Sequence, residues 1–107
     1  MARVDNYEQR VGGIGRLYTP EGLARLRQAH VCVIGIGGVG SWVVEALARS
    51  GVGQITMIDM DDICVTNINR QLPALSGNIG KLNTEVMAER VNLINPECVV
   101  NVIDDFI

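Results

Sequence analysis

Two segments of this sequence have residue types that could bind a phosphorylated ligand. The first is Gly35-Ile-Gly-Gly-Val-Gly40, which follows a short apolar run of β-branched residues and precedes a helix-like segment. In that context Gly35 allows a tight turn, Gly37 lets the backbone approach a phosphate, and Gly40 lets the helix pack closely on the strand. The free N–H groups at the start of the helix also favour an anion. We therefore expect a nucleotide site here rather than a turn that binds nothing.

The second segment begins at Asp59, where the next apolar run ends. Its spacing from the glycines is that of the acidic residue that binds ribose hydroxyls in dinucleotide-binding folds. Asp59 and the glycines alone would predict an NAD(P)-dependent reductase. For the acidic residues that follow, Asp61 and Asp62, a solvated loop is a strong alternative to a binding role.

The loop then continues with polar side chains that suit phosphate. It contains Thr66, Asn67, Asn69 and Arg70. Amides can position phosphate oxygens and a guanidinium can neutralise them, so this loop favours a triphosphate over NAD. The simpler alternative is a helix cap at Thr66 or Asn67, which accounts less well for Asn67 and Arg70 together.

The composition is that of one small domain in a reducing compartment. Of 107 residues, 48% are hydrophobic and 4% aromatic, as expected for a parallel sheet covered by helices. The net charge is −3 with scattered basic residues, which shows no nucleic-acid-binding face but does not exclude a nucleic-acid substrate. Three widely spaced cysteines argue against a disulfide framework or zinc site, and Cys32 is expected to be buried in a strand. With no leader or membrane segment in this stretch, a cytoplasmic location is expected.

The order of apolar runs and helix signals predicts an α/β fold. We expect the N-terminal half of a Rossmann-like, doubly wound parallel sheet, preceded by short N-terminal helices. The predicted strands are residues 31–35, 55–59 and 99–103, and the predicted crossover helices are 39–49 and 80–95. A short helix near 5–11, a loop, and a helix from 19 to 29 should come first. We divide the chain into a helical segment, 1–30, and a partial nucleotide-binding domain, 31–107, truncated after the third strand.

Helical spacing predicts which side chains face the core. The predicted inward residues of the three longer helices are Leu17, Leu23 and Leu26, then Val39, Val43, Ala46 and Leu47, then Val86, Met87, Val91 and Ile94. Thr19 should cap its helix, with Pro20 at the first position. Because no closing helix follows the third strand, we expect a fragment of a longer protein, with one face of the sheet uncovered.

The motifs, in order, resemble one superfamily. Gly-Ile-Gly-Gly-Val-Gly, Ile-Asp-Met-Asp-Asp-Ile and Thr-Asn-Ile-Asn-Arg-Gln are similar to the ubiquitin-activating-enzyme-like adenylating superfamily. Glu-Val-Met-Ala-Glu-Arg, Ile-Asn-Pro-Glu-Cys and the leader between Arg10 and Arg16 resemble its tRNA threonylcarbamoyladenosine dehydratase branch. The resemblance implies that ATP adenylates a carboxylate of a modified tRNA, which then cyclises. A second branch, which adenylates sulfur-carrier proteins, is the alternative, and a catalytically silent nucleotide-binding or dimerisation module is another.

The resemblance also implies roles for single residues. Gly38 would lie against the ATP phosphates and Asp59 would hold the ribose. Thr66, Asn67 and Arg70, with Asp61 and Asn69 beside them, would form the phosphate-side wall. Arg16, or less readily Arg10, would reach into the partner subunit's site of a homodimer.

This sequence departs from the superfamily's pattern in two ways. Asn83 stands where the superfamily has a phosphate-binding lysine, and Lys81 is the expected substitute. On one helix the two side chains would point about 200° apart, since each residue advances by about 100°. The magnesium-binding aspartate motif of the superfamily follows a fourth strand, so Mg²⁺ ligands are expected beyond residue 107 and none before it.

Overall fold

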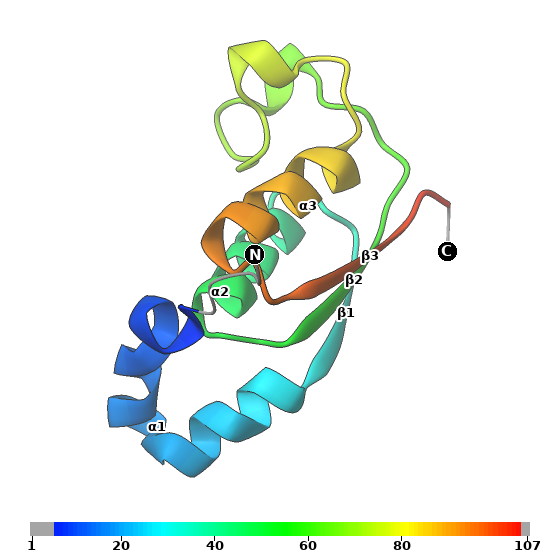
Figure 1. Cartoon of the computed structure of the whole chain (residues 1–107). Helices are drawn as coiled ribbons and strands as arrows, with labels where there is room; N and C mark the ends of the chain where they lie inside the picture. Colours follow the sequence, from blue (N-terminus) through cyan, green and yellow to red (C-terminus); the bar gives the residue numbers. More distant parts are fainter. Residues whose placement is uncertain (1–5, 106–107) are drawn as a thin grey trace, which may run out of the picture.

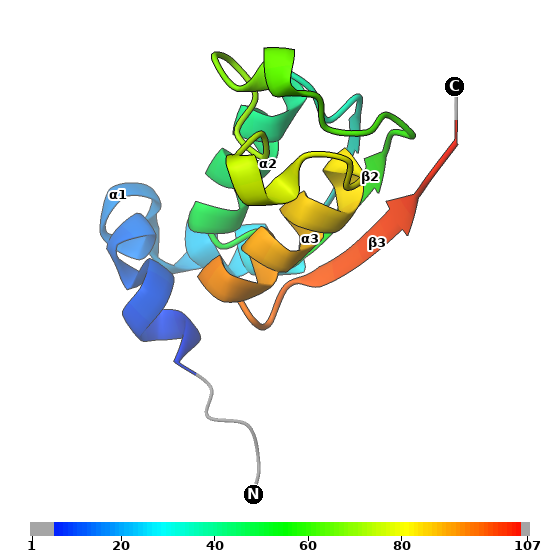
Figure 2. The same ribbon diagram turned by 90° about the horizontal axis from the view of Figure 1, so that it is seen from above.

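The computed structural model describes residues 6–105 and places in them a parallel sheet of three strands with helices on one face (Figures 1 and 2). The strands are β1 (His30–Ile34), β2 (Gln54–Ile58) and β3 (Val99–Ile103), in the spatial order β1-β2-β3. Val33 pairs with Met57, which pairs with Val102. The expected α/β parallel sheet is confirmed, although β1 and β2 each begin one residue early.

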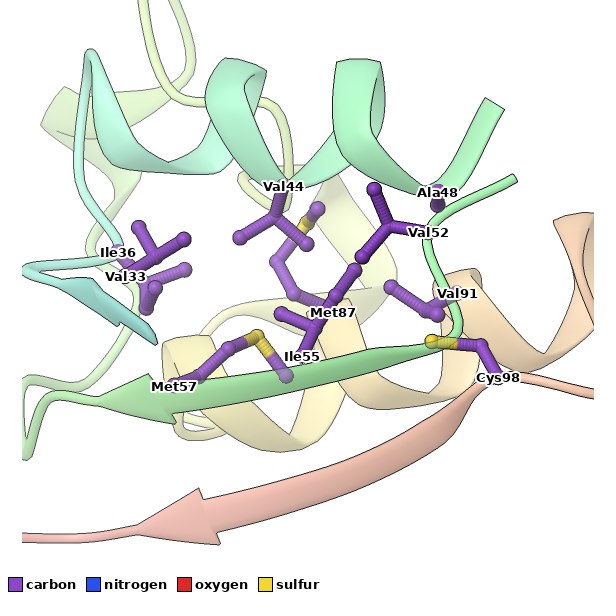
Figure 3. Close-up of a cluster of buried hydrophobic side chains, with 10 residues drawn as sticks. All are labelled: Val33, Ile36, Val44, Ala48, Val52, Ile55, Met57, Met87, Val91 and Cys98. Atoms are coloured by element: carbon purple, nitrogen blue, oxygen red, sulfur yellow. The ribbon is translucent and has the colours of Figure 1, made fainter. Parts of the chain in front are cut away.

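The crossover helices α2 (Gly40–Arg49) and α3 (Asn83–Ile94) pack on the same face of the sheet. The core between these layers is shown in Figure 3 and consists of Val33, Ile36, Val44, Ala48, Val52, Ile55, Met57, Met87, Val91 and Cys98. In α3, Met87 and Val91 are buried as expected, and Val86 and Ile94 are partly buried. This layered core fixes the carboxyl ends of the strands, where the predicted site residues lie.

The buried face of α2 differs from the expected one. Val44 and Ala48 are fully buried, whereas Val39 is 80% exposed and Val43 is 41% exposed. Ala46 is also exposed and Leu47 is partly buried. The buried residues of α2 have helical spacing, as predicted, but they lie one position further along the sequence than expected. The buried face also contains two polar residues with hydrogen-bond partners.

Those polar contacts come from Ser41 and Glu45, both buried in α2. Ser41 Oγ accepts a hydrogen bond from the N–H of Leu72 at 3.2 Å. The Glu45 carboxylate accepts hydrogen bonds from Arg90 on α3 at 2.6 Å and from Arg49 at 2.7 Å. Hydrogen bonding to Arg90 holds the pKa of Glu45 below its usual value, although burial opposes this shift. An apolar pattern alone could not reveal these partners.

The N-terminal helix α1 (Tyr7–Gln28) consists of two helical segments joined at Thr19, whose φ is +74°. The loop expected after residue 11 is therefore helical, because packing buries Tyr7 and Val11 of one segment against Leu23 of the other. Thr19 Oγ1 accepts the N–H of Gly22 at 3.2 Å, which confirms the predicted cap. Leu26 packs against the core as expected, but Leu17 is 70% exposed. The start predicted near residue 5 lies outside the described residues.

The face of the sheet opposite the helices carries exposed residues. Cys32 and Ile34 are exposed, so the expected burial of Cys32 is wrong. The alternation of strand side chains explains this, because Val31 and Val33 of β1 point toward the core and Cys32 points to the opposite face. Thr56 stays buried on the exposed face, where its Oγ1 lies 2.6 Å from His30 Nε2 and accepts a hydrogen bond from Asn101 Nδ2. None of the helices in residues 6–105 is long and apolar enough to span a membrane.

Candidate nucleotide-binding site

A cavity of about 490 Å³ opens at the carboxyl ends of β1 and β2. Ligands of open α/β sheets bind in this position, and the volume is typical of small-molecule sites. Its walls come from the turn after β1, the loop after β2, the 3₁₀ helix η1 (Val65–Asn67) with the residues just after it, and the start of α3. The lining residues are Gly35, Gly37, Asp59, Asp61, Asp62, Cys64, Asn67, Gln71 and Asn83.

The glycine turn has the geometry that its sequence predicts. Gly35 has φ +85°, a conformation that favours glycine. A Cβ atom at Gly40 would lie 1.6 Å from the carbonyl oxygen of Gly35, so no other residue fits there without moving the backbone. These contacts bring the first turn of α2 directly onto the end of β1.

Asp59 joins two walls of the cavity. Its Oδ2 accepts the N–H of Ile36 in the glycine turn at 2.5 Å, and its Oδ1 accepts the N–H of Asp61 at 2.6 Å. Each carboxylate oxygen keeps a further lone pair that could accept a hydrogen bond from a ligand. Asp59 can therefore still accept hydrogen bonds from ribose hydroxyls, as the predicted role requires.

The start of α3 differs from expectation and decides which side chain reaches the cavity. Residues 80–82 pair with the loop after β2 instead of forming helix: Ile63 donates its N–H to Lys81 O at 2.8 Å, and Asp62 bridges Leu82. Asn83, now the first residue of α3, donates its N–H to Asp61 O at 3.1 Å and lines the cavity. Lys81 is exposed, with Nζ 3.5 Å from Asn78 Oδ1, and is not a lining residue.

The polar loop after β2 is held by its own hydrogen bonds. Asn67 Oδ1 accepts the N–H of Cys64 at 2.9 Å, which is the capping role weighed above, although Asn67 also lines the cavity. Arg70 Nη1 donates to Thr66 O at 3.1 Å and to Asn69 Oδ1 at 3.0 Å. These contacts orient the exposed guanidinium.

Arg70 also lies beside the glycine turn. Its Cγ is 4.0 Å from the place where a Cβ of Gly38 would stand, and its carbonyl oxygen accepts the indole N–H of Trp42. The residues predicted from sequence that do not line the cavity are Gly38, Gly40, Thr66, Asn69, Arg70, Lys81 and Arg16.

The two N-terminal arginines lie away from the cavity. They belong to α1, which Figure 1 shows at the other end of the sheet. Arg10 Nη1 donates to Leu93 O at 3.1 Å and to Ile94 O at 3.2 Å, so it binds the end of α3. Arg16 is exposed and makes no hydrogen bond or ion pair within residues 6–105. Of the two, Arg16 is the one available to another molecule.

The cavity is acidic. Asp59, Asp61 and Asp62 line it, and none of its lining residues is Lys or Arg. Residues 6–105 contain no group of three or more His, Cys, Asp or Glu side chains arranged to hold a metal ion. The described residues therefore do not by themselves fit a magnesium site.

Three lining residues, Cys64, Gln71 and Asn83, are not predicted from the sequence as binding residues, and Asp62 is predicted as either a binding or a solvated loop residue. Asp62 and Cys64 flank the buried Ile63, whose 1% exposure shows that it anchors the loop and turns its neighbours toward the cavity. Gln71 directly follows Arg70, and this position next to a predicted site residue is the only sequence feature that could have indicated its place in the cavity. Asn83 was recognised only as a missing lysine.

Comparison with known proteins agrees with this fold. The ThiF family model matches residues 10–107. The chain is 85% identical over 107 residues to the tRNA threonylcarbamoyladenosine dehydratase of Haemophilus influenzae, covering 100% of this chain and 41% of that protein. The crystal structure of the E. coli tRNA N6-threonylcarbamoyladenosine dehydratase in complex with ATP superimposes with a TM-score of 0.95 and 58% identity, covering 100% of this chain and 44% of that one.

A relative from the alternative branch is less similar. The sulfur carrier protein adenylyltransferase of Thermus thermophilus is 36% identical over 77 residues, which cover 72% of this chain and 28% of that protein. The chain spans less than half the length of each relative described here. From the family match over residues 10–107, the chain belongs to the ThiF family.

Proposed function

We propose that the protein containing this chain uses ATP to adenylate the carboxylate of threonylcarbamoyladenosine in tRNA, and that the product then cyclises with loss of water overall. The main support is the cavity between the glycine turn and Asp59, in a chain that is 58% identical over its whole length to an enzyme crystallised with ATP. The name of the Haemophilus influenzae relative supports tRNA as the substrate.

In the proposed reaction a carboxylate oxygen of the substrate attacks the α-phosphorus of ATP. A phosphorus–oxygen bond forms, the bond to the β-phosphate breaks, and pyrophosphate leaves with the electron pair. An internal nucleophile of the substrate then attacks the activated carbonyl and loses its proton to solvent, while the bond from the acyl carbon to the phosphate oxygen breaks, so the ring closes and AMP leaves with the electron pair. Arg70 is placed beside Gly38, where its guanidinium can counter the negative charge that develops on the phosphates.

The described residues fit the nucleoside end of ATP better than its phosphates. The cavity is lined by the carboxylates of Asp59, Asp61 and Asp62, which repel phosphate oxygens, whereas Arg70 is not a lining residue. We propose that Mg²⁺ and its ligands, with the charge that they supply, come from residues beyond 107. No step in the proposed chemistry is assigned to that ion.

We further propose that the protein acts as a homodimer in the cytoplasm. Arg16 supports a dimer, because it is exposed on α1, the helix that lies at the end of the sheet away from the cavity, and has no partner within residues 6–105. We propose that this arginine reaches into the site of a second subunit.

Isotope exchange between pyrophosphate and ATP tests the proposal. We expect exchange that depends on tRNA carrying threonylcarbamoyladenosine and is absent with unmodified tRNA. Exchange that depends instead on a small carrier protein ending in Gly-Gly would support the sulfur-carrier alternative. ATP binding without exchange with either substrate would support a silent nucleotide-binding module.

A further inference from the structure

The role proposed for Arg70 requires its side chain to keep a fixed place relative to the glycine turn. The hydrogen bonds of its guanidinium do not provide this, because both acceptors, Thr66 O and Asn69 Oδ1, belong to its own loop. These bonds fix the side chain on the loop, but they do not connect the loop to the turn. Other contacts therefore determine where Arg70 lies relative to the turn.

Two hydrogen bonds connect the loop to the first turn of α2, which directly follows the glycine turn. Trp42 Nε1 donates to the backbone oxygen of Arg70 at 3.2 Å. Leu72 donates its backbone N–H to Ser41 Oγ, also at 3.2 Å. The segment 70–72 is thus held against the start of α2 at both of its ends.

Ser41 extends this connection into the glycine turn itself. Its hydroxyl donates a hydrogen bond to Gly37 O while it accepts the one from Leu72, so a single side chain bridges the turn and the loop. Ser41 is fully buried, and Leu72 packs against the core. A buried hydroxyl whose donor and acceptor are both paired rigidifies the segments that it joins.

Trp42 bonds the very residue whose side chain lies beside the turn. The Cγ of Arg70 is 4.0 Å from the place where a Cβ of Gly38 would stand. The Trp42 side chain is 54% exposed and does not belong to the core that α2 shares with the sheet. Core packing therefore does not explain a tryptophan at this position, whereas its bond to Arg70 O gives it a specific contact.

We propose that Ser41 and Trp42 are positioning residues, which hold Arg70 beside the glycine turn for the adenylation step. This inference rests on the proposed function and on the part that Arg70 has in it, and it adds two residues that act through Arg70. Their effect belongs to the rate of adenylation rather than to ATP affinity, because a charge that acts mainly in the transition state has to be in place when the reaction occurs.

A double-mutant cycle in the protein containing this chain tests the inference. Its readouts are the exchange of pyrophosphate into ATP with modified tRNA and the calorimetric titration of ATP. Trp42→Phe keeps an aromatic ring but removes the N–H donor. Its exchange rate should fall about three- to tenfold, the effect of losing one neutral hydrogen bond, while ATP affinity changes by less than about threefold.

The second arm of the cycle makes the same substitution in Arg70→Ala. Alanine keeps the backbone oxygen that Trp42 bonds, so the loop contact is still present before Trp42 is changed. Because no guanidinium is left to position, Trp42→Phe should now lower the rate by less than about twofold. A general loss of structure would instead lower the rate equally in both backgrounds.

Two further variants complete the test. Ser41→Ala should show the same loss of rate at nearly constant ATP affinity, together with a lower melting temperature, because the N–H of Leu72 loses its acceptor. Val43→Ala is the matched control, since it shortens a 41% exposed side chain at the next position of α2. It should leave the exchange rate and the ATP affinity unchanged.

Three results would overturn the inference. One is a Trp42→Phe variant that exchanges pyrophosphate as fast as the wild type. Another is an equal loss of rate with and without the Arg70 side chain, which would show that Trp42 acts on another group. The third is an ATP affinity that falls as much as the rate. A wild type without exchange on modified tRNA would instead refute the proposed function, and with it this inference.

Discussion

Oδ2 of Asp59 accepts a hydrogen bond from the backbone N–H of Ile36 at 2.5 Å, which joins the end of β2 to the glycine turn after β1. The two residues directly follow neighbouring strands, whose register brings Ile34 opposite Ile58. The acidic residue that we expect to hold the ribose therefore also shapes the turn that we expect to face the phosphates. Binding and local structure are coupled at this contact.

Asp59→Ala should abolish ATP binding and also lower stability. It removes the acceptor of two backbone hydrogen bonds, from Ile36 and Asp61, and each is worth about 1 kcal/mol or somewhat more because the acceptor is charged. Calorimetry and thermal unfolding would measure both effects. Glu89→Gln, which removes an exposed carboxylate from α3, should change neither. Unchanged ATP affinity in Asp59→Ala would show that the ribose assignment is wrong.

Arg70→Ala should slow the exchange of pyrophosphate into ATP about 10- to 100-fold while changing the affinity for ATP by less than about threefold. Arg70 is exposed and its Cγ lies beside Gly38, so we expect its charge to help most when negative charge builds up on the phosphates. Arg70→Lys keeps the positive charge but loses the paired N–H donors of the guanidinium, so its exchange rate should lie between those of the wild type and Arg70→Ala. An affinity that falls as much as the rate would place Arg70 in ground-state binding instead.

Gly40→Ala should destabilise the fold by about 3 kcal/mol or prevent folding, because overpacking against a backbone is not relieved by a side-chain rotation. The new Cβ would lie 1.6 Å from Gly35 O. Gly12→Ala is the matched control: no atom lies within 4 Å of its Cβ position in α1, so it should stabilise the protein by about 0.5–1 kcal/mol. Urea unfolding of both variants measures the difference. Equal stabilities would contradict the close approach of α2 to β1.

Glu45→Gln should destabilise the protein by about 1–2 kcal/mol at neutral pH through its weakened bonds to Arg90 and Arg49. Because the folded pKa of Glu45 lies below its ordinary value of 4.5, its ionised form stabilises the fold above that pH. The contribution is lost as the pH falls through the lowered pKa, so the two proteins should converge in acid. The exposed Glu85→Gln is the control. A stability difference that persists in strong acid would contradict this account.

Local sequence rules predicted the parts of the fold that depend on local patterns. The three strands, the cap at Thr19 and the glycine turn all follow from residue type and spacing. The buried face of α2 could not be predicted in this way, because Ser41 and Glu45 owe their burial to Leu72 and Arg90, which are distant in the sequence.

In the candidate site, too, some residues follow from local sequence patterns and others depend on contacts between distant segments. Asp59 and the glycines were found from their spacing, and the cavity contains Asp59, Gly35 and Gly37. Asn83 reaches it only because residues 80–82 pair with the loop around Ile63, so that α3 begins later than its helical signals suggested. Capping and helical spacing concern residues that are neighbours in sequence, so they cannot predict this pairing between two separate loops.

A crystal structure of the protein with ATP would test the central claim most directly. We predict that the sugar lies in the cavity with its hydroxyls within hydrogen-bonding distance of Asp59. The phosphates should extend toward Gly38 and Arg70. ATP bound elsewhere, or with its phosphates among Asp59, Asp61 and Asp62, would contradict this account.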